Sequence, residues 1–370
     1  MTHRLSAIAA GCLLLAPALA AAPPTVQARY TATTRGDIVE LRDTREDIVV
    51  SVLTPTSNAY EMVVKGHHVI RRTFASLDAL RANPGLNGVP LLWPYANRLD
   101  EQAFYANGTK YSFDTGLGNT GRGAIPIHGY LTNTKAWKVV EAKADAAGAW
   151  VTSRLEFYRY PRYMKQFPFA HVLTMTYRLA DGALEVRTSL ENLSTEPMPV
   201  TIGFHPYFQL TDSPKDDWTL AVRARTHWLL NASTIPTGET QPIAALLPDP
   251  HNVSVKEFPA LDDVFTDLER DADGRATITL KGRKQELDVI VGPNYRTALV
   301  LTRTGGGRRG GPPPAGGQAL PPTPESVAIE PMAGVSNAMN LAERGLYKEL
   351  QSVPPGGTWA ESFWIRPRGF

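Results

Sequence analysis

The chain has 370 residues, among them 38 Lys and Arg, 36 Asp and Glu, and a single cysteine. A nearly balanced charge without a basic run argues against binding to a phosphate backbone, so we expect no nucleic-acid partner. The 30 glycines and 30 prolines predict many turns and few long helices.

The first twenty residues have the pattern of a removable export signal. The polar, positive start Thr2–Arg4 is followed by the mainly apolar run Leu5–Leu19, and Ala18–Ala20 has the small-x-small pattern of a cleavage site. A transmembrane anchor is the alternative, but the run is shorter than the roughly 20 apolar residues a bilayer requires and contains a proline. We therefore expect cleavage near residues 20–22, a periplasmic or secreted protein, and no stable membrane association afterwards.

The only cysteine, Cys12, lies within this signal. A lipoprotein signal at Ala9–Cys12 is a weaker alternative, because most of the apolar run follows the cysteine. After cleavage the protein has no thiol, which excludes disulfides, cysteine-ligated zinc and a cysteine nucleophile. Removal of Arg4 leaves 37 basic against 36 acidic residues, a charge that suits a neutral ligand.

Regular elements are predicted mostly as strands, because apolar residues alternate with polar ones. The dipeptide Asp181-Gly182 predicts a tight hairpin turn between two of them. In chain order we expect a helix at 74–82, strands at 151–157, 173–179, 184–190, 218–224 and 298–302, and a helix at 341–350. Many antiparallel strands joined by short turns indicate an all-β fold, a large antiparallel β-sandwich with few short helices.

One segment, residues 305–324, is rich in Gly and Pro and cannot bury apolar area. Only about 46 residues follow it, too few for a second sandwich. We therefore interpret 21–370 as a single domain with a flexible insertion at 305–324.

Three ionisable residues stand in apolar surroundings. Arg98 follows an aromatic, proline-containing stretch and is either a structural ion-pair partner or a donor to ligand oxygens. His205 is either a satisfied core side chain or a proton donor, and Pro206 restricts its backbone to extended geometry. Glu330 closes the apolar strand 327–329, where a carboxylate is either at a solvent-facing edge or functional.

Further candidates are His128, whose neighbour Gly129 allows close approach of another group, and the adjacent carboxylates Asp262 and Asp263, which could bond vicinal hydroxyls. Four other histidines need no special role: His67, His68, His171 and His227. His227 is expected on the polar face of its strand.

No Ser-His-Asp arrangement, phosphate loop or metal-ligand spacing is present in the sequence. We therefore expect neither a metal site nor a cofactor. The two carboxylates of a glycosidase are not excluded, since carboxylates are plentiful.

In this order the motifs resemble those of the aldose 1-epimerase (galactose mutarotase) family, over roughly Thr31 to Pro367. The matching stretches are LLWPYANRLDEQAFYANGTKY, IPIHGYL, GFHPYFQL, LDDVF, ESVAIEPMAGVSNAMN and SVPPGGTW. One such motif would be weak evidence, but six in the same order are specific.

The resemblance implies a galactose-mutarotase-type supersandwich with a carbohydrate pocket on one sheet. It implies that His205 is the general acid for the ring oxygen and Glu330 the general base for the anomeric hydroxyl. We expect these two side chains on opposite sides of one sugar-sized hollow. The implied activity is interconversion of the α and β anomers of free aldoses of the glucose and galactose type.

The resemblance also implies the residues that hold the sugar. These are Asn97, Arg98, His128 and Asp262, with Asp263 as the alternative if the register shifts by one. The partner is then a small-molecule sugar.

The sequence departs from the family pattern at Gln209, Met332 and Asn337, so it does not specify the aldose, and it gives no oligomeric state. A hexose-phosphate epimerase would require a cluster of Arg and Lys at the pocket. A catalytically silent carbohydrate-binding domain would not require both His205 and Glu330. A polysaccharide-cleaving enzyme on a similar sandwich is a further alternative.

Overall fold

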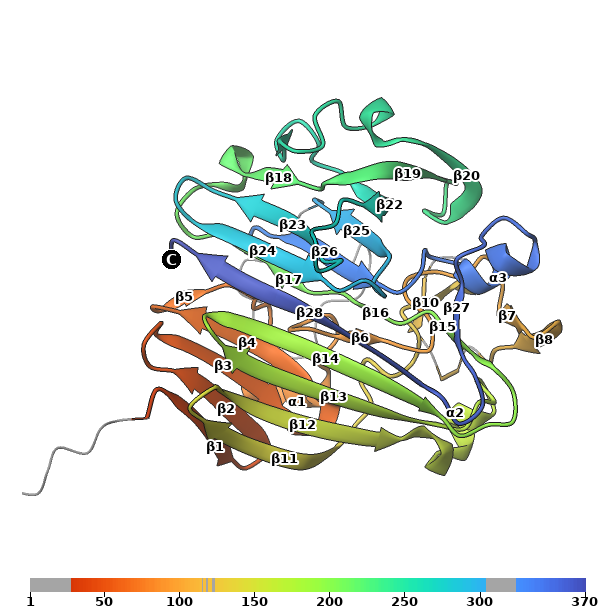
Figure 1. Ribbon diagram of the computed structural model, residues 1–370, viewed down its shortest axis with the longest axis horizontal. Helices are drawn as coiled ribbons and strands as arrows, with labels where there is room; N and C mark the ends of the chain where they lie inside the picture. Colours follow the sequence, from red (N-terminus) through yellow and green to blue (C-terminus); the bar gives the residue numbers. More distant parts are fainter. Residues whose placement is uncertain (1–27, 115, 118, 122–123, 304–323) are drawn as a thin grey trace, which may run out of the picture.

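The computed structural model describes residues 28–114, 116–117, 119–121, 124–303 and 324–370. The predicted export signal and all of the predicted insertion except Pro324 lie outside these residues. Two large antiparallel sheets and a smaller one make up most of the described chain (Figure 1). The predicted all-β class is confirmed.

The smallest of the three sheets is formed by the N-terminal strands and packs beside β11–β13. Its order is β1 (Tyr30–Arg35), β2 (Ile38–Asp43), β3 (Ile48–Leu53), β4 (Asn58–Val64) and β5 (His67–His68).

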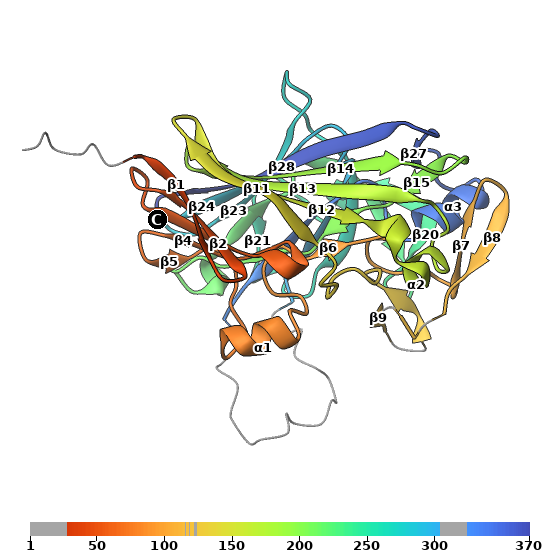
Figure 2. The ribbon, with the colours of Figure 1, turned by 90° about the horizontal axis from the view of Figure 1, so that it is seen from below.

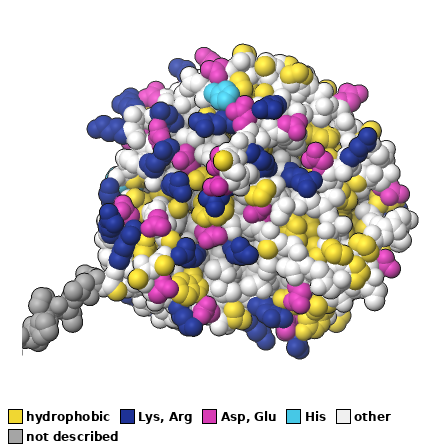
Figure 3. All heavy atoms as spheres, viewed as in Figure 1, with side chains coloured by type: hydrophobic (Ala, Val, Ile, Leu, Met, Phe, Trp, Pro, Cys, Tyr) yellow, Lys and Arg dark blue, Asp and Glu magenta, His cyan; other side chains and the backbone are white. Residues whose placement is uncertain are grey.

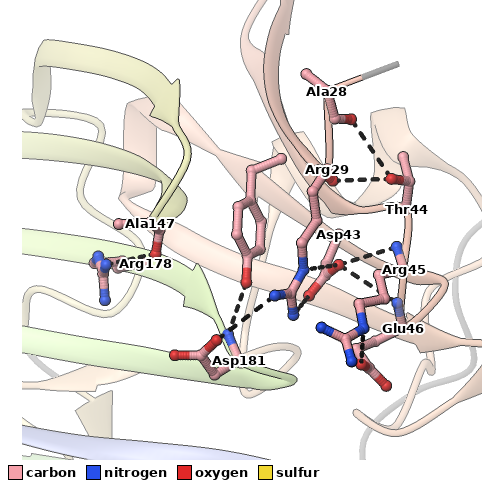
Figure 4. Close-up of polar contacts among 10 residues, drawn as sticks. Ala28, Arg29, Asp43, Thr44, Arg45, Glu46, Ala147, Arg178 and Asp181 are labelled. Carbon is pink, nitrogen blue, oxygen red and sulfur yellow. Dashed lines mark hydrogen bonds and ion pairs between the residues drawn. The ribbon is translucent and has the colours of Figure 1, made fainter. Parts of the chain in front are cut away.

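A polar cluster fixes the beginning of this sheet to the neighbouring one (Figure 4). Arg29 donates two hydrogen bonds of 3.0 Å to the buried carboxylate of Asp43 and lies 3.7 Å from Asp181. The backbone N–H of Asp181 donates to the hydroxyl of Tyr30. Because Asp181 belongs to the turn between β13 and β14, these contacts connect the first described residues to the larger sheet.

The nine-stranded sheet contains the strands with the clearest alternation in the sequence. Its order is β11 (Lys138–Asp145), β12 (Gly148–Glu156), β13 (His171–Ala180), β14 (Ala183–Asn192), β28 (Thr358–Arg368), β24 (Glu286–Val291), β23 (Ala276–Lys281), β18 (Thr219–Ala221) and β21 (Val253–Ser254).

The predicted hairpin between β13 and β14 is confirmed. Its two turn residues, Asp181 and Gly182, have φ of 47° and 72°. Positive φ at both central positions is what a two-residue type I′ turn requires, and Asp-Gly tolerates it.

The eight-stranded sheet carries the candidate site. Its order is β20 (Pro236–Pro242), β19 (Ala224–Leu230), β22 (Asp262–Leu268), β25 (Thr297–Leu301), β26 (Val327–Met332), β16 (Gly203–Phe204) and β6 (Leu91–Leu92), and β17 (Tyr207–Phe208) also pairs with β26.

Shorter elements complete the described chain, and Figure 2 shows α1 on the side of the molecule away from β14 and β28. The short strand pairs are β7 (Ala103–Ala106) with β8 (Thr109–Ser112), β9 (Asn119–Thr120) with β10 (Pro126–Ile127), and β15 (Met198–Val200) with β27 (Gln351–Val353). The α-helices are α1 (Leu77–Ala82), α2 (Pro161–Met164) and α3 (Ala338–Glu343).

The two faces of the eight-stranded sheet have different surroundings. Ile329 belongs to the main apolar core, which also includes Val50 of β3 and Tyr177 of β13. Met332, on the other side of the strand, packs in a second cluster with Leu341 of α3. Successive side chains of a strand point to opposite faces, so Glu330 shares a face with Met332, away from the main core.

The last part of the chain supplies inner strands to both large sheets. Strand β26 lies between β25 and β16/β17, and β28 lies between β14 and β24. Neither strand is at an edge, so each large sheet is continuous only when this late segment is in place.

Three predicted elements differ from the structure at their ends. The strand expected at 218–224 is interrupted after Ala221, because Arg223 has φ of 51° and the chain passes there from one large sheet to the other. The helix expected at 341–350 is α3, which begins at Ala338 and ends at Glu343. It ends there because Gly345 adopts φ of 73° and the N–H of Leu346 bonds back to the carbonyl of Leu341. The helix expected at 74–82 begins only at Leu77, after an N-cap serine.

On the face shown in Figure 3, acidic and basic side chains are interspersed and form no large patch of one sign. No helix in the described part of the chain combines the length and the apolar composition needed to cross a bilayer.

Candidate active site

His205, which lies between β16 and β17, is a neighbour of Glu330 on β26 in the eight-stranded sheet. Gly203 pairs with Met332 and Tyr207 with Ala328, and the same register places His205 opposite Glu330. His205 Nε2 lies 3.1 Å from Glu330 Oε1, and the side chains are 5% and 0% exposed.

This arrangement corrects the expectation that the two side chains face each other across a hollow. They lie side by side on one face of the sheet, because an antiparallel register holds opposite residues about 5 Å apart. Adjacency is also what an anomeric carbon requires, since its hydroxyl oxygen and the ring oxygen are bonded to the same carbon.

Burial dominates the protonation of this pair. It lowers the pKa of His205 to about 3, and the nearby charges of Arg71 and Arg98 act in the same direction. Burial, and then the charge of Asp262, raise the pKa of Glu330 well above its usual range. Contact between the two groups opposes both shifts, because it stabilises the ion pair. The two shifts favour a protonated Glu330 beside a neutral His205, a state with one proton in the pair.

Asn97 connects Glu330 to a strained loop. Its Nδ2 donates to Glu330 Oε2 at 3.1 Å, and its carbonyl accepts from the backbone N–H of His128 at 2.7 Å. Asn97 and His128 have φ of 51° and 63°, in the left-handed region that is costly for residues other than glycine. Such geometry persists only where surrounding contacts impose it, and it clusters at functional sites.

Gly129 allows this loop to lie against Trp93. With φ of 61°, a Cβ at this position would meet the carbonyl oxygen of Trp93 at 2.1 Å. The close approach places the His128 ring 5.0 Å from that of His205, edge to face. Burial, followed by the charges of His205 and Arg98, lowers the pKa of His128 well below its usual value.

Arg98 and Asp262 lie at the more accessible side of the site. Their side chains are 22% and 17% exposed, and Arg98 Nη2 lies 3.5 Å from Asp262 Oδ2. Both line a cavity of about 440 Å³, together with Ile125, Ile127 and Thr234 among others. That volume falls within the range of small-molecule sites, and the lining includes neither His205 nor Glu330.

Asp263 is not part of this group. Its carboxylate lies 2.9 Å from His227 Nε2, and His227 is 5% exposed. His227 was expected on the polar face of its strand, but it is buried against Phe265. Alternation along β22 thus turns Asp262 and Asp263 to opposite faces.

Several buried polar atoms of the site have no hydrogen-bond partner in the protein. They are His128 Nδ1, His205 Nδ1 and Glu330 Oε1, whose contact with His205 lacks hydrogen-bond geometry. Because buried polar groups are nearly always bonded, these atoms are open to hydrogen bonds from water or from a polar ligand. In the described residues no three His, Cys, Asp or Glu side chains are grouped to hold a metal ion.

Two residues of this region were not identified from the sequence. Tyr207 stacks on His205 with ring centroids 4.9 Å apart, and burial raises its pKa to about 12. Arg71 faces Tyr207 from the neighbouring segment, and its guanidinium carbon lies 3.5 Å from the centroid of the Tyr207 ring. Tyr207 could have been found from its spacing of two from His205, which puts both on one face of a strand. Arg71 has no such signal, because its position depends on a distant strand.

Comparison with known proteins agrees with these motifs. The family model described as aldose 1-epimerase matches residues 65–330, which is most of the chain. The chain belongs to the aldose 1-epimerase family. It is thus related to epimerases, and the family implies a small sugar substrate.

Solved structures similar to this aldose 1-epimerase family member show the same fold. A galactose mutarotase-like protein from Clostridium acetobutylicum has a TM-score of 0.74 at 18% identity, over 92% of this chain and 98% of that one. A galactose 1-epimerase from Lactobacillus acidophilus has a TM-score of 0.67 at 14% identity, over 92% and 98%. An aldose epimerase homologue from C. elegans has a TM-score of 0.65 at 15% identity, over 88% and 97%. The mutarotase-type supersandwich is confirmed.

Proposed function

We propose that this protein interconverts the α and β anomers of free aldoses of the glucose and galactose type, by general acid–base ring opening and reclosure. The observation that carries the proposal is the 3.1 Å contact between His205 Nε2 and Glu330 Oε1 on one buried face of the sheet. A proton donor and a proton acceptor held side by side suit two oxygens bonded to one carbon.

The single proton of the pair is sufficient for the reaction. When it moves from Glu330 to His205, the pair becomes a carboxylate and an imidazolium. Glu330 then removes the proton of the anomeric hydroxyl, whose O–H electrons form the C1=O bond. The bond between C1 and the ring oxygen breaks, its electrons remain on that oxygen, and the oxygen takes the proton of His205.

Ring opening therefore returns the pair to a protonated Glu330 and a neutral His205, the state that burial favours. The open aldehyde turns about its C1–C2 bond, and the same steps in reverse close the ring on the other face of C1. Asn97, bonded to Glu330 Oε2, fixes the orientation of the base. His128, Arg98 and Asp262 bond the sugar oxygens and hold the ring in place.

Polarimetry of freshly dissolved α-D-glucose and α-D-galactose tests the proposal. We expect wild-type protein to accelerate mutarotation, and His205→Asn and Glu330→Gln each to lower the rate constant by roughly 10²- to 10⁴-fold. Matched controls are His67→Asn and Glu343→Gln, since both of these residues are exposed. A wild-type rate equal to that of either active-site variant would contradict the proposal.

A silent carbohydrate-binding domain is the second candidate, favoured by the same buried polar atoms. It predicts sugar binding by calorimetry that survives Glu330→Gln without any acceleration by the wild type.

We also propose that residues 1–20 are removed on export and that 21–370 act as one domain in the periplasm or outside the cell. N-terminal sequencing of exported fractions tests this. An uncleaved cytosolic protein would argue for the hexose-phosphate alternative.

A further inference from the structure

Arg71 is a buried cation beside the proposed acid. The isolated bridge between Ile70 and Phe208, and the 2.9 Å bond from Arg71 N–H to the Tyr207 carbonyl, place Arg71 opposite Tyr207. The residue is 7% exposed, and its guanidinium lies over the Tyr207 ring. Its Nη1 reaches Ser326 Oγ at 3.5 Å, and its Nε has no hydrogen-bond partner.

The chain offers no carboxylate to this guanidinium. No ion pair in the described part of the chain includes Arg71, and Tyr207 alone raises its pKa against the effect of burial. The residues that the structure does not describe include no Asp and no Glu. A buried charge that lacks a counter-charge is destabilising, so an anionic ligand would stabilise the guanidinium.

Two other arginines show what satisfied side chains look like in this fold. Arg98 lies 3.5 Å from Asp262. Arg270 donates to the backbone carbonyls of Gly274, Gly292 and Tyr295. Among the described residues Arg71 has neither kind of partner, and its guanidinium contacts only Tyr207 and Ser326.

The strand order gives Arg71 a defined place relative to the sugar. Strand β26 carries Glu330, the next strand carries His205 and Tyr207, and the segment ending at Arg71 follows on the far side. In the proposed reaction Glu330 faces the anomeric hydroxyl and His205 faces the ring oxygen. The other carbon bonded to the ring oxygen is C5, so its exocyclic C6 group extends past His205 towards Arg71.

We propose that Arg71 binds an anionic group at C6 of the aldose, so that the preferred substrates are uronic acids with a C6 carboxylate. This inference rests on the proposed epimerase function. A guanidinium recognises a carboxylate through charge-assisted hydrogen bonds, and its stacking on Tyr207 holds it in place. A phosphate at C6 is also an anion that a guanidinium can bind, but its oxygens extend further from the ring than those of a carboxylate. The experiment below separates the carboxylate from the phosphate.

The test compares kcat/KM for mutarotation of D-galacturonate, D-galactose and D-glucose 6-phosphate. We expect wild type to prefer galacturonate over galactose, and Arg71→Met to lower that preference roughly 10- to 100-fold. Arg71→Lys should retain part of it. The matched control is Arg72→Met, because Arg72 is exposed and adjacent, and it should leave the preference unchanged.

The outcomes separate this inference from the function on which it rests. If the protein accelerates mutarotation of galactose but prefers neither anionic sugar, the inference alone is overturned. The same holds if Arg71→Met lowers kcat/KM equally for all three sugars. A preference for glucose 6-phosphate that is lost in Arg71→Met supports the anion site and identifies phosphate as the group. Acceleration of no sugar overturns both. If Arg71→Met does not fold, added salt should raise KM for galacturonate but not for galactose in wild type, and an equal response overturns the inference.

Discussion

The carboxylate of Asp263 lies 2.9 Å from Nε2 of the buried His227, on the face of β22 opposite to Asp262. Two adjacent aspartates thus have separate surroundings. One lines the 440 Å³ cavity beside Arg98, and the other contacts the buried His227.

The same substitution at these two positions should have different effects. Asp262→Asn weakens the contact to Arg98 and the proposed contact to the sugar hydroxyls, and we expect kcat/KM to fall roughly 10- to 100-fold. Asp263→Asn weakens the bond to His227, and we expect a loss of about 1–2 kcal/mol in the free energy of unfolding with a much smaller change in kcat/KM. Polarimetry and urea denaturation of both variants measure this. The reverse pattern would make Asp263 the sugar-binding residue.

The pH dependence of kcat/KM should be broad. In the proposed reaction the pair of His205 and Glu330 works with one proton. The pair gains a second proton only at low pH, because burial lowers the pKa of His205 to about 3. Burial also raises the pKa of Glu330, which moves the loss of the last proton to higher pH. We therefore expect a plateau through neutral pH with falls at both ends. A fall centred near pH 6.5, the ordinary value for histidine, would contradict this protonation state.

Gly129→Ala should destabilise the protein and impair the site together. A Cβ at Gly129 would overlap the Trp93 carbonyl in addition to the strain of positive φ, and we expect a loss of roughly 2–4 kcal/mol in unfolding free energy. Gly66→Ala is the matched control, since Gly66 also has positive φ but no atom within 4 Å of the added Cβ. That change should cost about 1 kcal/mol. Equal costs in urea denaturation would show that the contact with Trp93 does not matter.

The cluster of Arg29 and Asp43 should make part of the stability acid-sensitive. Burial alone would raise the pKa of Asp43, but the bonds from Arg29 and from the N–H groups of Arg45 and Glu46 outweigh it, and the pKa is lowered. A lowered pKa in the folded state gives stability that is present above the unfolded value of about 3.9 and is lost as pH falls through the folded value.

We therefore expect Asp43→Asn to lower the unfolding free energy by about 1–3 kcal/mol at pH 7 and by less in acid. The comparison is Asp78→Asn, because Asp78 is 91% exposed and solvent screens its ion pair with Arg81, so this change should have little effect on stability. Urea denaturation at pH 7 and at pH near 3 measures both variants, and a pH-independent difference for Asp43→Asn would refute the prediction.

Local patterns in the sequence were sufficient for the strands that pair with their neighbours in the chain. Strands β13 and β14 alternate strictly and are joined by Asp181-Gly182, so neither depends on distant residues for its identity. The strand expected at 218–224 was less well predicted, because its break at Arg223 is imposed by the passage between two sheets. Tertiary structure decides such breaks, and periodicity does not report them.

For the site, the sequence identified His205 and Glu330 as candidates but not their distance. That distance depends on the register between strands that are far apart in the chain. The burial of His227 and the position of Arg71 have the same origin, since each depends on a partner more than thirty residues away. Long-range pairing is the part of the fold that composition and spacing describe least.

The inner positions of β26 and β28 have a consequence for how this protein is made. Both strands lie within the last 44 residues, counted from Val327, so during synthesis the flanking strands of both sheets leave the ribosome before the strands that join them. Until then β14, β24 and β25 each have an open edge, and the nascent chain is exposed to aggregation. Loss of β28 would divide the nine-stranded sheet between β14 and β24, so a nonsense mutation just before this strand should be as damaging as an early one.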